Sequence, residues 1–367
     1  MDNTLVRLPV YSKLAQIVIG LVAFFYVLYI GQDIILPLVF ATIIAILLNP
    51  LVNWLCKKKF NRVLAIFIAL FIAIVVIVGL IYFIGSQMTM FSDSFPQFKE
   101  KFTKFSSSTE TWISHTFNIS KSKIDGWLTQ TKGESMNNST AVITQTLGTI
   151  SGMLVMIFLL PVYIFMILFY KPLLLDFISQ LFKKDQHAVV AEVLLETKTL
   201  IQSYLVGLLF EAILVATLNS IGLLIIGIDY AILLGVIGAL LNIIPYIGGV
   251  IAIALPMLIA FATKTPIDAL WVLVVYLVVQ FIDNNFFVPK IVASKVKINA
   301  LISIIVVLIG GALWGVPGMF LSIPITAILK VIFDRIEPLK PFGFLLGDNQ
   351  PDLGKNIFTY KKPRKKK

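Results

Sequence analysis

The stretch Leu241-Asn242-Ile243-Ile244-Pro245-Tyr246-Ile247-Gly248-Gly249 interrupts a long apolar run near its middle. Hydrophobicity alone would make that run, Ala231 to Ala262, one very long membrane helix. The proline removes a backbone donor and the glycines open left-handed conformations, so the stretch predicts a break. Broken backbone at membrane depth is tolerated only where protein or a water-filled cavity satisfies its polar groups.

A second apolar run, Ile302 to Lys330, has the same plan and is interrupted between Gly310 and Gly318. The residues before the two breaks are similar, since Ile237-Gly238-Ala239-Leu240-Leu241 resembles Ile309-Gly310-Gly311-Ala312-Leu313. Two Gly/Pro-interrupted hydrophobic segments in corresponding positions point to a transporter binding site. The alternative is two kinked spanning helices that are not related as a repeat.

The composition is that of a multi-span membrane protein. The 367 residues are 58% hydrophobic and 13% charged, with a mean hydropathy of +0.95. The net charge of +11 comes from basic residues beside apolar runs and in the tail, which is typical of cytoplasmic membrane flanks. We therefore expect no nucleic-acid partner.

Enzymatic and metal chemistry lack candidate residues. The single cysteine, Cys56, excludes an intramolecular disulfide, and the two histidines, His115 and His187, are far apart in polar segments. No phosphate-binding glycine loop, zinc-protease motif or nucleophile elbow is present. The sequence predicts no catalytic residue, no metal site, no cofactor and no ATP-driven pump.

The alternation of apolar and polar segments predicts five regions. They are N-terminal membrane helices (1–85), an extracytoplasmic helical insert (86–147), a fourth membrane helix with a cytoplasmic connector (148–199), a transport core with two broken hairpins (200–335) and a cytoplasmic basic tail (336–367). Aromatic residues at helical spacing from Phe91 to Trp112 indicate that the insert is helical.

The positions of the basic residues distinguish two possible topologies. If 231–262 is a single crossing, the loop with Lys290, Lys295 and Lys297 lies outside the cell. If it is a re-entrant hairpin, that loop is cytoplasmic, and the run from Ile302 must be a second hairpin if the tail is to stay inside. We predict an all-α integral membrane protein with six spanning helices plus two re-entrant hairpins and with both termini in the cytoplasm. Eight spanning helices are the alternative.

Polar residues inside the apolar runs are the candidate substrate or ion pathway. Glu211 and Asp283 are ionisable, and such groups usually face a protein interior or a water pathway, or hold helices together. We expect the two breaks to meet near the bilayer midplane beside Asp283. The full predicted set is Glu211, Asn219, Asn242, Pro245, Tyr246, Gly248, Gln280, Asp283, Asn284, Asn285, Gly311, Gly315, Pro317 and Gly318.

Three motifs resemble a known family, the autoinducer-2 exporters, which are bacterial multi-span transporters. They are Asn242 to Gly248, Gln280 to Asn285 continuing to Pro289-Lys290, and Gly310 to Met319 continuing to Ile323-Pro324. The ending Leu345-Leu346-Gly347-Asp348 is also similar. The likeness is specific from Tyr204 to Asp348, and the first half fits only by its layout. The chain departs from the family pattern at Asp283, where the family has Glu, and at Asn284, where Gly is common.

The resemblance implies secondary transport in the bacterial inner membrane, with autoinducer-2 or another small solute exported. Some relatives are described as sodium/proton antiporters, so a cation/proton antiporter is the first alternative. A non-transporting scaffold whose insert and tail bind partners is the second. The expected partners are membrane lipid and a small-molecule or cation substrate, and a homo-oligomer remains open.

Overall fold

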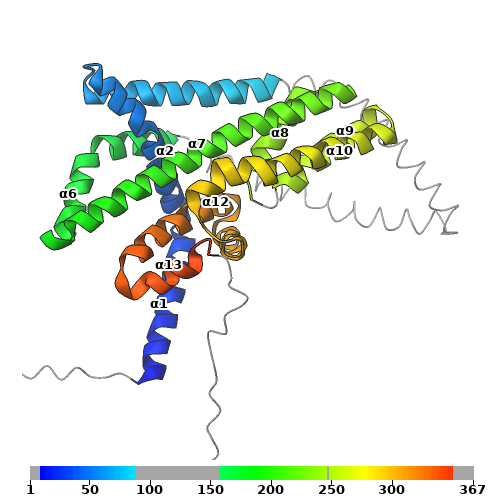
Figure 1. Ribbon diagram of the computed structural model, residues 1–367. Coiled ribbons are helices and arrows are strands. Elements are labelled where there is room, and N and C mark those ends of the chain that lie inside the picture. The colour runs from blue at the N-terminus through cyan, green and yellow to red at the C-terminus, as the bar shows by residue number, and fades with distance from the viewer. Residues whose placement is uncertain (1–8, 87–157, 246–247, 350–367) are drawn as a thin grey trace, which may run out of the picture.

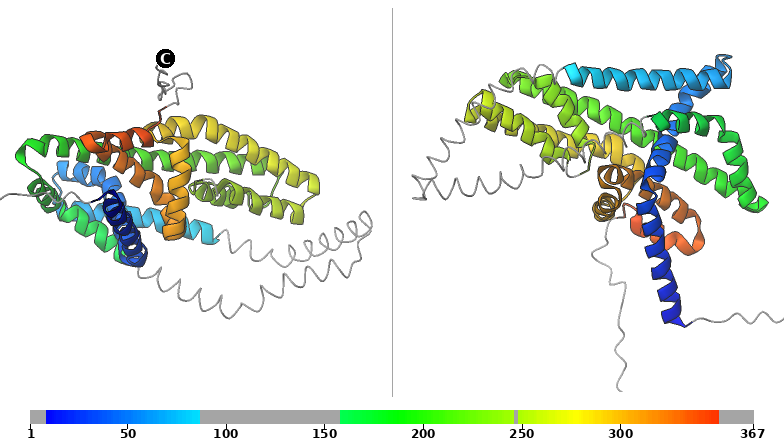
Figure 2. Two further views of the ribbon diagram at one scale, coloured as in Figure 1. Left: turned by 90° about the horizontal axis from the view of Figure 1, so that it is seen from below. Right: turned by 180° about the vertical axis from the view of Figure 1, so that it is seen from behind.

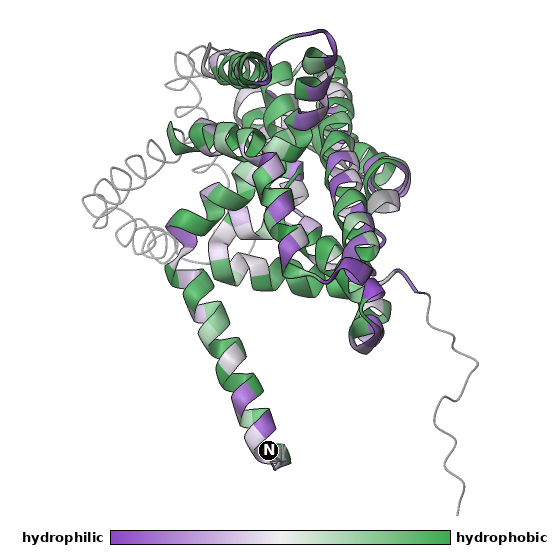
Figure 3. Ribbon diagram, turned by 90° about the vertical axis from the view of Figure 1, so that its left-hand side faces the viewer, coloured by the Kyte–Doolittle hydropathy of each residue, from purple (hydrophilic) through white to green (hydrophobic). Residues whose placement is uncertain are grey.

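The computed structural model describes residues 9–86, 158–245 and 248–349. In these ranges every regular element is a helix, apart from an isolated bridge between Ile298 and Gly347. Hydrophobic residues cover most of the long helices, including faces that no other helix covers (Figure 3). The protein is therefore an all-α integral membrane protein, as predicted.

The elements are as follows (Figure 1). The helices are α1 (Val10–Ile30), α2 (Gln32–Lys57), Arg62–Ser86, Phe158–Phe169, α6 (Lys171–Leu181), α7 (His187–Ile226), α8 (Ala231–Asn242), α9 (Gly248–Thr263), α10 (Pro266–Ile282), α11 (Ser294–Val296), α12 (Ala300–Arg335) and α13 (Lys340–Leu346). The π-helix η2 (Asp283–Ala293) continues α10, and the short 3₁₀ helices are η1 (Lys184–Gln186) and η3 (Glu337–Leu339).

The N-terminal helices pack through small residues. Ala41 and Ala45 of α2 and Ala65 and Ala69 of Arg62–Ser86 are at most 2% exposed and lie in one core cluster with Phe158–Phe169. Alanines allow helix backbones to approach closely, which is how membrane helices associate without a hydrophobic driving force. In contrast, α1 has no buried residue and projects away from the other helices (Figure 1).

One side chain of α7 completes the hydrogen bonding of a proline kink in α2. Pro50 has no N–H, so the carbonyl of Ile46, four residues earlier, has no helical donor. Gln202 of α7 donates its amide N–H to that oxygen at 2.7 Å. This bond ties the N-terminal helices to the predicted transport core.

The first predicted break is present and makes α8 and α9 a hairpin. With 12 and 16 residues they are about 18 and 24 Å long, short of the roughly 30 Å hydrocarbon core. A Cβ on Gly248 would lie 1.8 Å from the carbonyl oxygen of Leu241, so only glycine allows the two ends to approach in this way. A Cβ on Gly235 of α8 would likewise clash with Ser220 of α7, so this glycine allows the two helices to pack closely.

The second break reverses the direction of α12. Gly315 has φ 61° and ψ −143°, a conformation that is essentially restricted to glycine. A Cβ on Gly318 would lie 2.0 Å from the carbonyl oxygen of Gly310, although eight residues of straight helix would separate the two by about 12 Å. The arms of α12 therefore fold back on each other, and Figure 2 shows them as separate helices.

Both hairpins agree with the predicted fold. By length and composition, six helices in the described ranges could span a membrane, and α12 is one of them. Because α12 is a hairpin, the five that remain are α1, α2, Arg62–Ser86, α7 and α10 with η2. The bent pair of Phe158–Phe169 and α6 would be a sixth if it forms one span. Residues 87–157, which hold most of the predicted insert, lie outside the described ranges.

The C-terminal segment is fastened to the loop after η2. The amide of Asp348 donates to the carbonyl of Lys297, and the amide of Asn299 donates to that of Leu346. At the other end of α12, Arg335 pairs with Glu192 and Glu196 on the N-terminal part of α7. These contacts hold α12 and α13 against α7 and the loop at 297–299.

Candidate functional site

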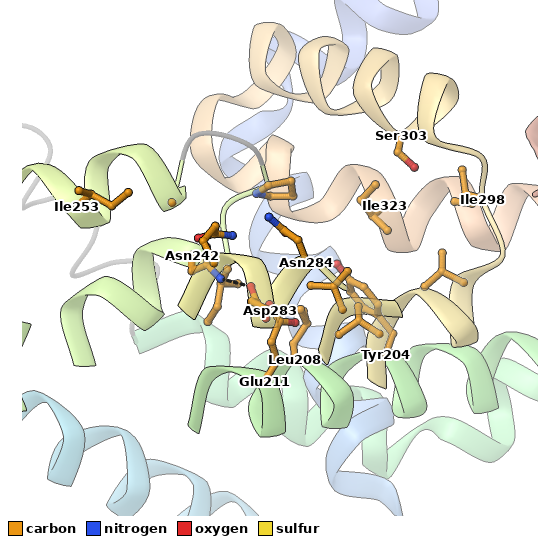
Figure 4. Close-up of a pocket in the computed structure, with 17 residues that line it drawn as sticks. Tyr204, Leu208, Glu211, Asn242, Ile253, Asp283, Asn284, Ile298, Ser303 and Ile323 are labelled. Atoms are coloured by element: carbon orange, nitrogen blue, oxygen red, sulfur yellow. Dashed lines mark hydrogen bonds between the residues drawn. The ribbon is translucent and has the colours of Figure 1, made fainter. Parts of the chain in front are cut away.

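A cavity of about 650 Å³ lies where α7, the first break, α10 with η2, and α12 meet (Figure 4). Tyr204, Leu208 and Glu211 come from α7, and Ser303 and Ile323 come from the two arms of α12. The rest of the lining is Asn242, Ile243, Pro245, Gly249, Ile253, Gln280, Asp283, Asn284, Val288, Val292, Val296 and Ile298. Its size is that of a small-molecule binding pocket.

The π-helix η2 shapes one wall of this cavity. α10 begins at a capping box formed by Thr265 and Asp268 and passes directly into η2 at Asp283. The lining residues Asn284, Val288 and Val292 recur every four positions and so lie on one face of η2. π-helical segments are rare and occur frequently at functional sites.

Asp283 is the most buried polar residue of the cavity, with 1% of its surface exposed. Its Oδ2 accepts a hydrogen bond of 2.8 Å from the amide of Asn242, across the first break. Its Oδ1 is buried and has no hydrogen-bond partner in the described part of the chain. A buried carboxylate oxygen without a donor is able to take a proton, a cation or a solute donor.

Glu211 adds a second carboxyl group to the same cavity. It is 6% exposed and close enough to Asp283 for the two groups to interact electrostatically. Figure 4 shows both side chains pointing into the space between α7 and η2. Two carboxyl groups that share a buried site can hold a proton or a cation between them.

Amide oxygens gather where the first break meets α10. A Cβ on Gly249 would lie 2.9 Å from Oε1 of Gln280 and 3.4 Å from Oδ1 of Asn242, so the glycine lets both approach the backbone. The described residues contain no group of three or more His, Cys, Asp or Glu side chains that could hold a metal ion. The carboxylate and amide oxygens that gather here can accept a proton, a monovalent cation or the donor groups of a polar solute.

The cavity collects part of the predicted set. Glu211, Asn242, Pro245, Gln280, Asp283 and Asn284 line it, and Gly248 supports the break beside it. Asn285 is exposed and donates to the carbonyl of Phe281. Asn219 is buried on α7 outside the lining, and its Oδ1 has no partner in the described ranges. Tyr246 lies outside the described residues.

The second break lies apart from the cavity lining. Gly311 packs against Met319 of the opposite arm, and Gly315, Pro317 and Gly318 are not lining residues. The indole N–H of Trp314 donates to the carbonyl of Leu28, so the tip of this hairpin packs on α1. Ser303 and Ile323, farther along the arms, reach the cavity instead.

Sequence reasoning missed the apolar wall and the residues from other helices. Val288, Val292 and Val296 look like lipid-facing residues, and Tyr204 and Ser303 are ordinary residues in apolar helices. Lining residues recur every four positions from Asn284 to Val296, but lipid-facing residues of a helix recur in the same way, so the sequence does not set this wall apart.

Comparison with known proteins agrees with the resemblance. The family described as "AI-2E family transporter" matches residues 18–337, which include the whole cavity lining. The chain belongs to this family. Family members are transporters of bacterial membranes, so this AI-2E family protein is a multi-pass membrane transporter.

Three relatives cover most of their own length and of this chain. "Putative transport protein YueF" of Bacillus subtilis is 27% identical over 83% of this chain and 84% of its own. "Putative transport protein YhhT" of Escherichia coli is 24% identical over 92% and 94%. "AI-2 transport protein TqsA" of Escherichia coli is 25% identical over 87% and 90%.

Proposed function

We propose that this AI-2E family protein is a secondary transporter that moves a small polar solute out of the cytoplasm and binds it in the cavity around Asp283. The observation that carries the proposal is Asp283, which lines the cavity and whose buried Oδ1 has no partner among the described residues. The cavity is bordered by a broken helix and a π-helix, and irregular backbone in a membrane is favoured where it lines such a space.

Autoinducer-2 is the first candidate solute because one relative is named for its transport. The amides of Asn242, Gln280 and Asn284 supply both donors and acceptors for a polar molecule. The outward direction is taken from the exporter family that the sequence resembles. The far end of the cavity reaches Val296 and Ile298 beside the basic residues of the same loop, which offers a route from that side of the membrane. The positive-inside rule assigns such a loop and both termini to the cytoplasm. The location proposed is the bacterial inner membrane, because the relatives are bacterial transport proteins.

A cation/proton antiporter is the second candidate, and the paired carboxyl groups favour it. A proton and a monovalent cation would compete for Glu211 and Asp283, with amide oxygens nearby as further ligands. No observation favours a scaffold.

We also propose the division of the chain into an N-terminal helical unit, the 86–147 insert and a transport core at 200–335.

Blocking the cavity tests whether it is the transport route. Purified protein is reconstituted into vesicles, and autoinducer-2 flux and proton flux are measured under imposed pH and sodium gradients. Ser303→Trp places a large side chain in the cavity, whereas Ile304→Trp, one residue on, points to an exposed face. We expect the first variant to lose flux and the second to retain it. Equal flux in both variants would contradict the proposal.

Autoinducer-2 flux and proton flux identify different functions. Release of autoinducer-2 that depends on the protein supports the exporter. Sodium-dependent proton flux without it supports the antiporter. Absence of every flux, in protein that is folded and correctly inserted, would favour the scaffold.

A further inference from the structure

The cavity has two chemically different ends. Around Asp283 the lining is polar, with Glu211, Asn242, Gln280 and Asn284. Away from Asp283, along η2 and the loop that follows it, the lining is apolar. Its members there are Val288, Val292, Val296 and Ile298, with Ile323 from α12. Figure 4 shows Glu211, Asn242 and Asn284 near Asp283, whereas Ile298 and Ile323 lie farther to the right, together with Ser303.

The apolar wall is larger than a purely polar solute needs. Pockets of about 300–1,000 Å³ enclose drug-sized ligands, and this cavity of about 650 Å³ falls in that range. Apolar surface facing an aqueous cavity is unfavourable unless something apolar covers it. Val292 and Val296 are at most 8% exposed and pack in a core cluster. Val288 and Ile298 are only partly buried, so a ligand with a polar head alone would leave these two uncovered.

The charged residues of the lining are all acidic. Glu211 and Asp283 carry carboxyl groups, and no lysine, arginine or histidine is among the lining residues that the structure describes. Both carboxyl groups are buried, so their interaction with a charged ligand is screened less than at a surface. This arrangement attracts a cationic head and opposes an anionic one.

Tyr204 adds an aromatic surface between the two ends. It is 4% exposed, lies on α7 before Glu211 in the chain, and contributes to the lining. Aromatic rings bind ammonium and quaternary ammonium groups through the negative face of the ring. A cationic head near the carboxyl groups would have this ring beside it.

We propose that the cavity binds amphiphilic organic cations, with the ammonium head at Asp283 and Glu211 and an alkyl chain along the wall from Val288 to Val296. This inference rests on the proposed transport function and specifies the substrate class of the same site. A small polar solute would then use only the polar end of the cavity.

The test uses alkyltrimethylammonium ions with chains of one to eight carbons, because they are permanently charged. Equilibrium binding is measured on the full-length protein in lipid nanodiscs, and binding to protein-free nanodiscs is subtracted. Alkylsulfonates of the same lengths are the anionic controls. Burial of about 0.8 kcal/mol per CH₂ predicts that affinity rises about fourfold per added carbon until the wall is covered.

Two variants separate the head from the chain. Asp283→Asn should weaken binding of every chain length by a similar factor, because it removes charge at the head. Val288→Thr, which is nearly isosteric, should reduce the gain per carbon and leave the one-carbon ion unaffected. Val278→Thr, at a position exposed on α10, is the matched control and should leave both the gain per carbon and the binding of the one-carbon ion unchanged.

Three results would overturn the inference. They are affinity that is independent of chain length, sulfonates that bind as tightly as the ammonium ions, or wild-type binding in Asp283→Asn. The proposed function fails separately. If autoinducer-2 is transported but the ammonium ions do not bind, only the substrate class is wrong. If the ions bind but no solute or proton flux occurs, the transport function is wrong.

Discussion

The close contact between the arms of α12 predicts that Gly318→Ala is strongly destabilising. The new Cβ would lie 2.0 Å from the carbonyl oxygen of Gly310, and a backbone oxygen cannot rotate away as a side chain can. Overpacking typically costs 1–3 kcal/mol, and this geometry justifies the upper end, about 3 kcal/mol. At about 2–4 °C per kcal/mol for large domains, the unfolding midpoint should fall by roughly 6–12 °C.

In the matched control, Gly20→Ala, the added methyl group is not expected to destabilise the protein. Gly20 lies in α1, where a Cβ would have no neighbouring atom within 4 Å, and alanine is the better helix former by about 1 kcal/mol. Gly20→Ala should therefore leave the midpoint unchanged or raise it slightly. The assay is thermal unfolding of each purified variant in the same detergent, followed by intrinsic fluorescence and by aggregation.

Gly315→Ala isolates the backbone contribution at the turn. No atom lies near the place that its Cβ would take, so the cost is that of the Gly-only conformation alone, about 1–3 kcal/mol. If Gly318→Ala and Gly315→Ala both behave like Gly20→Ala, α12 does not fold back at this point and the reasoning is refuted.

Two further predictions concern contacts that hold the helices together. Gln202→Leu leaves the carbonyl of Ile46 without a donor and should lower the free energy of unfolding by about 1–3 kcal/mol. Pro50→Ala restores a helical donor to that carbonyl, so the double variant should recover most of the lost stability. Additive effects in a thermal double-mutant cycle would contradict this. Asn299→Ala removes the hydrogen bonds that the Asn299 amide donates to the carbonyls of Leu345 and Gly347, so it should speed proteolytic cleavage of the C-terminal segment. Unchanged cleavage would contradict a role of these bonds in holding that segment.

The two breaks in the fold were predictable because particular residue types cause them. Pro245 and Gly248 mark the first break, and Gly315 marks the second, since each has a backbone requirement that few other residues meet. Asp283 was identifiable because a carboxylate inside an apolar run needs a protein environment. Local chemistry of this kind is visible in a single sequence.

The shape of the cavity was not predictable to the same extent. Ser303 and Ile323 reach it because both arms of α12 border the cavity, which is a matter of tertiary packing. The tip of the second hairpin instead meets α1 through Trp314 and Leu28, residues 286 positions apart in the chain. Nothing in the local sequence distinguishes a valine that faces a cavity from one that faces lipid, because both environments select the same side chain.

The π-helix is a further feature that periodicity alone does not give. Its 11 residues include Pro289, which lacks the N–H that an α-helix would need at that position. The polar cluster at its start was clear from the sequence, but the π-helical turn itself appears only in the folded chain.

Gradient-driven flux through Asp283→Asn tests the central claim most directly. The substitution keeps the size of the side chain and an oxygen able to accept from Asn242, while removing the charge. Asp33→Asn, at an exposed position in the first turn of α2, is the control. In reconstituted vesicles we expect Asp283→Asn to fold and insert but to lose gradient-driven flux, and Asp33→Asn to retain it. Unchanged flux with unchanged pH dependence in Asp283→Asn would contradict the account and leave this carboxyl group as a purely structural link between α8 and η2.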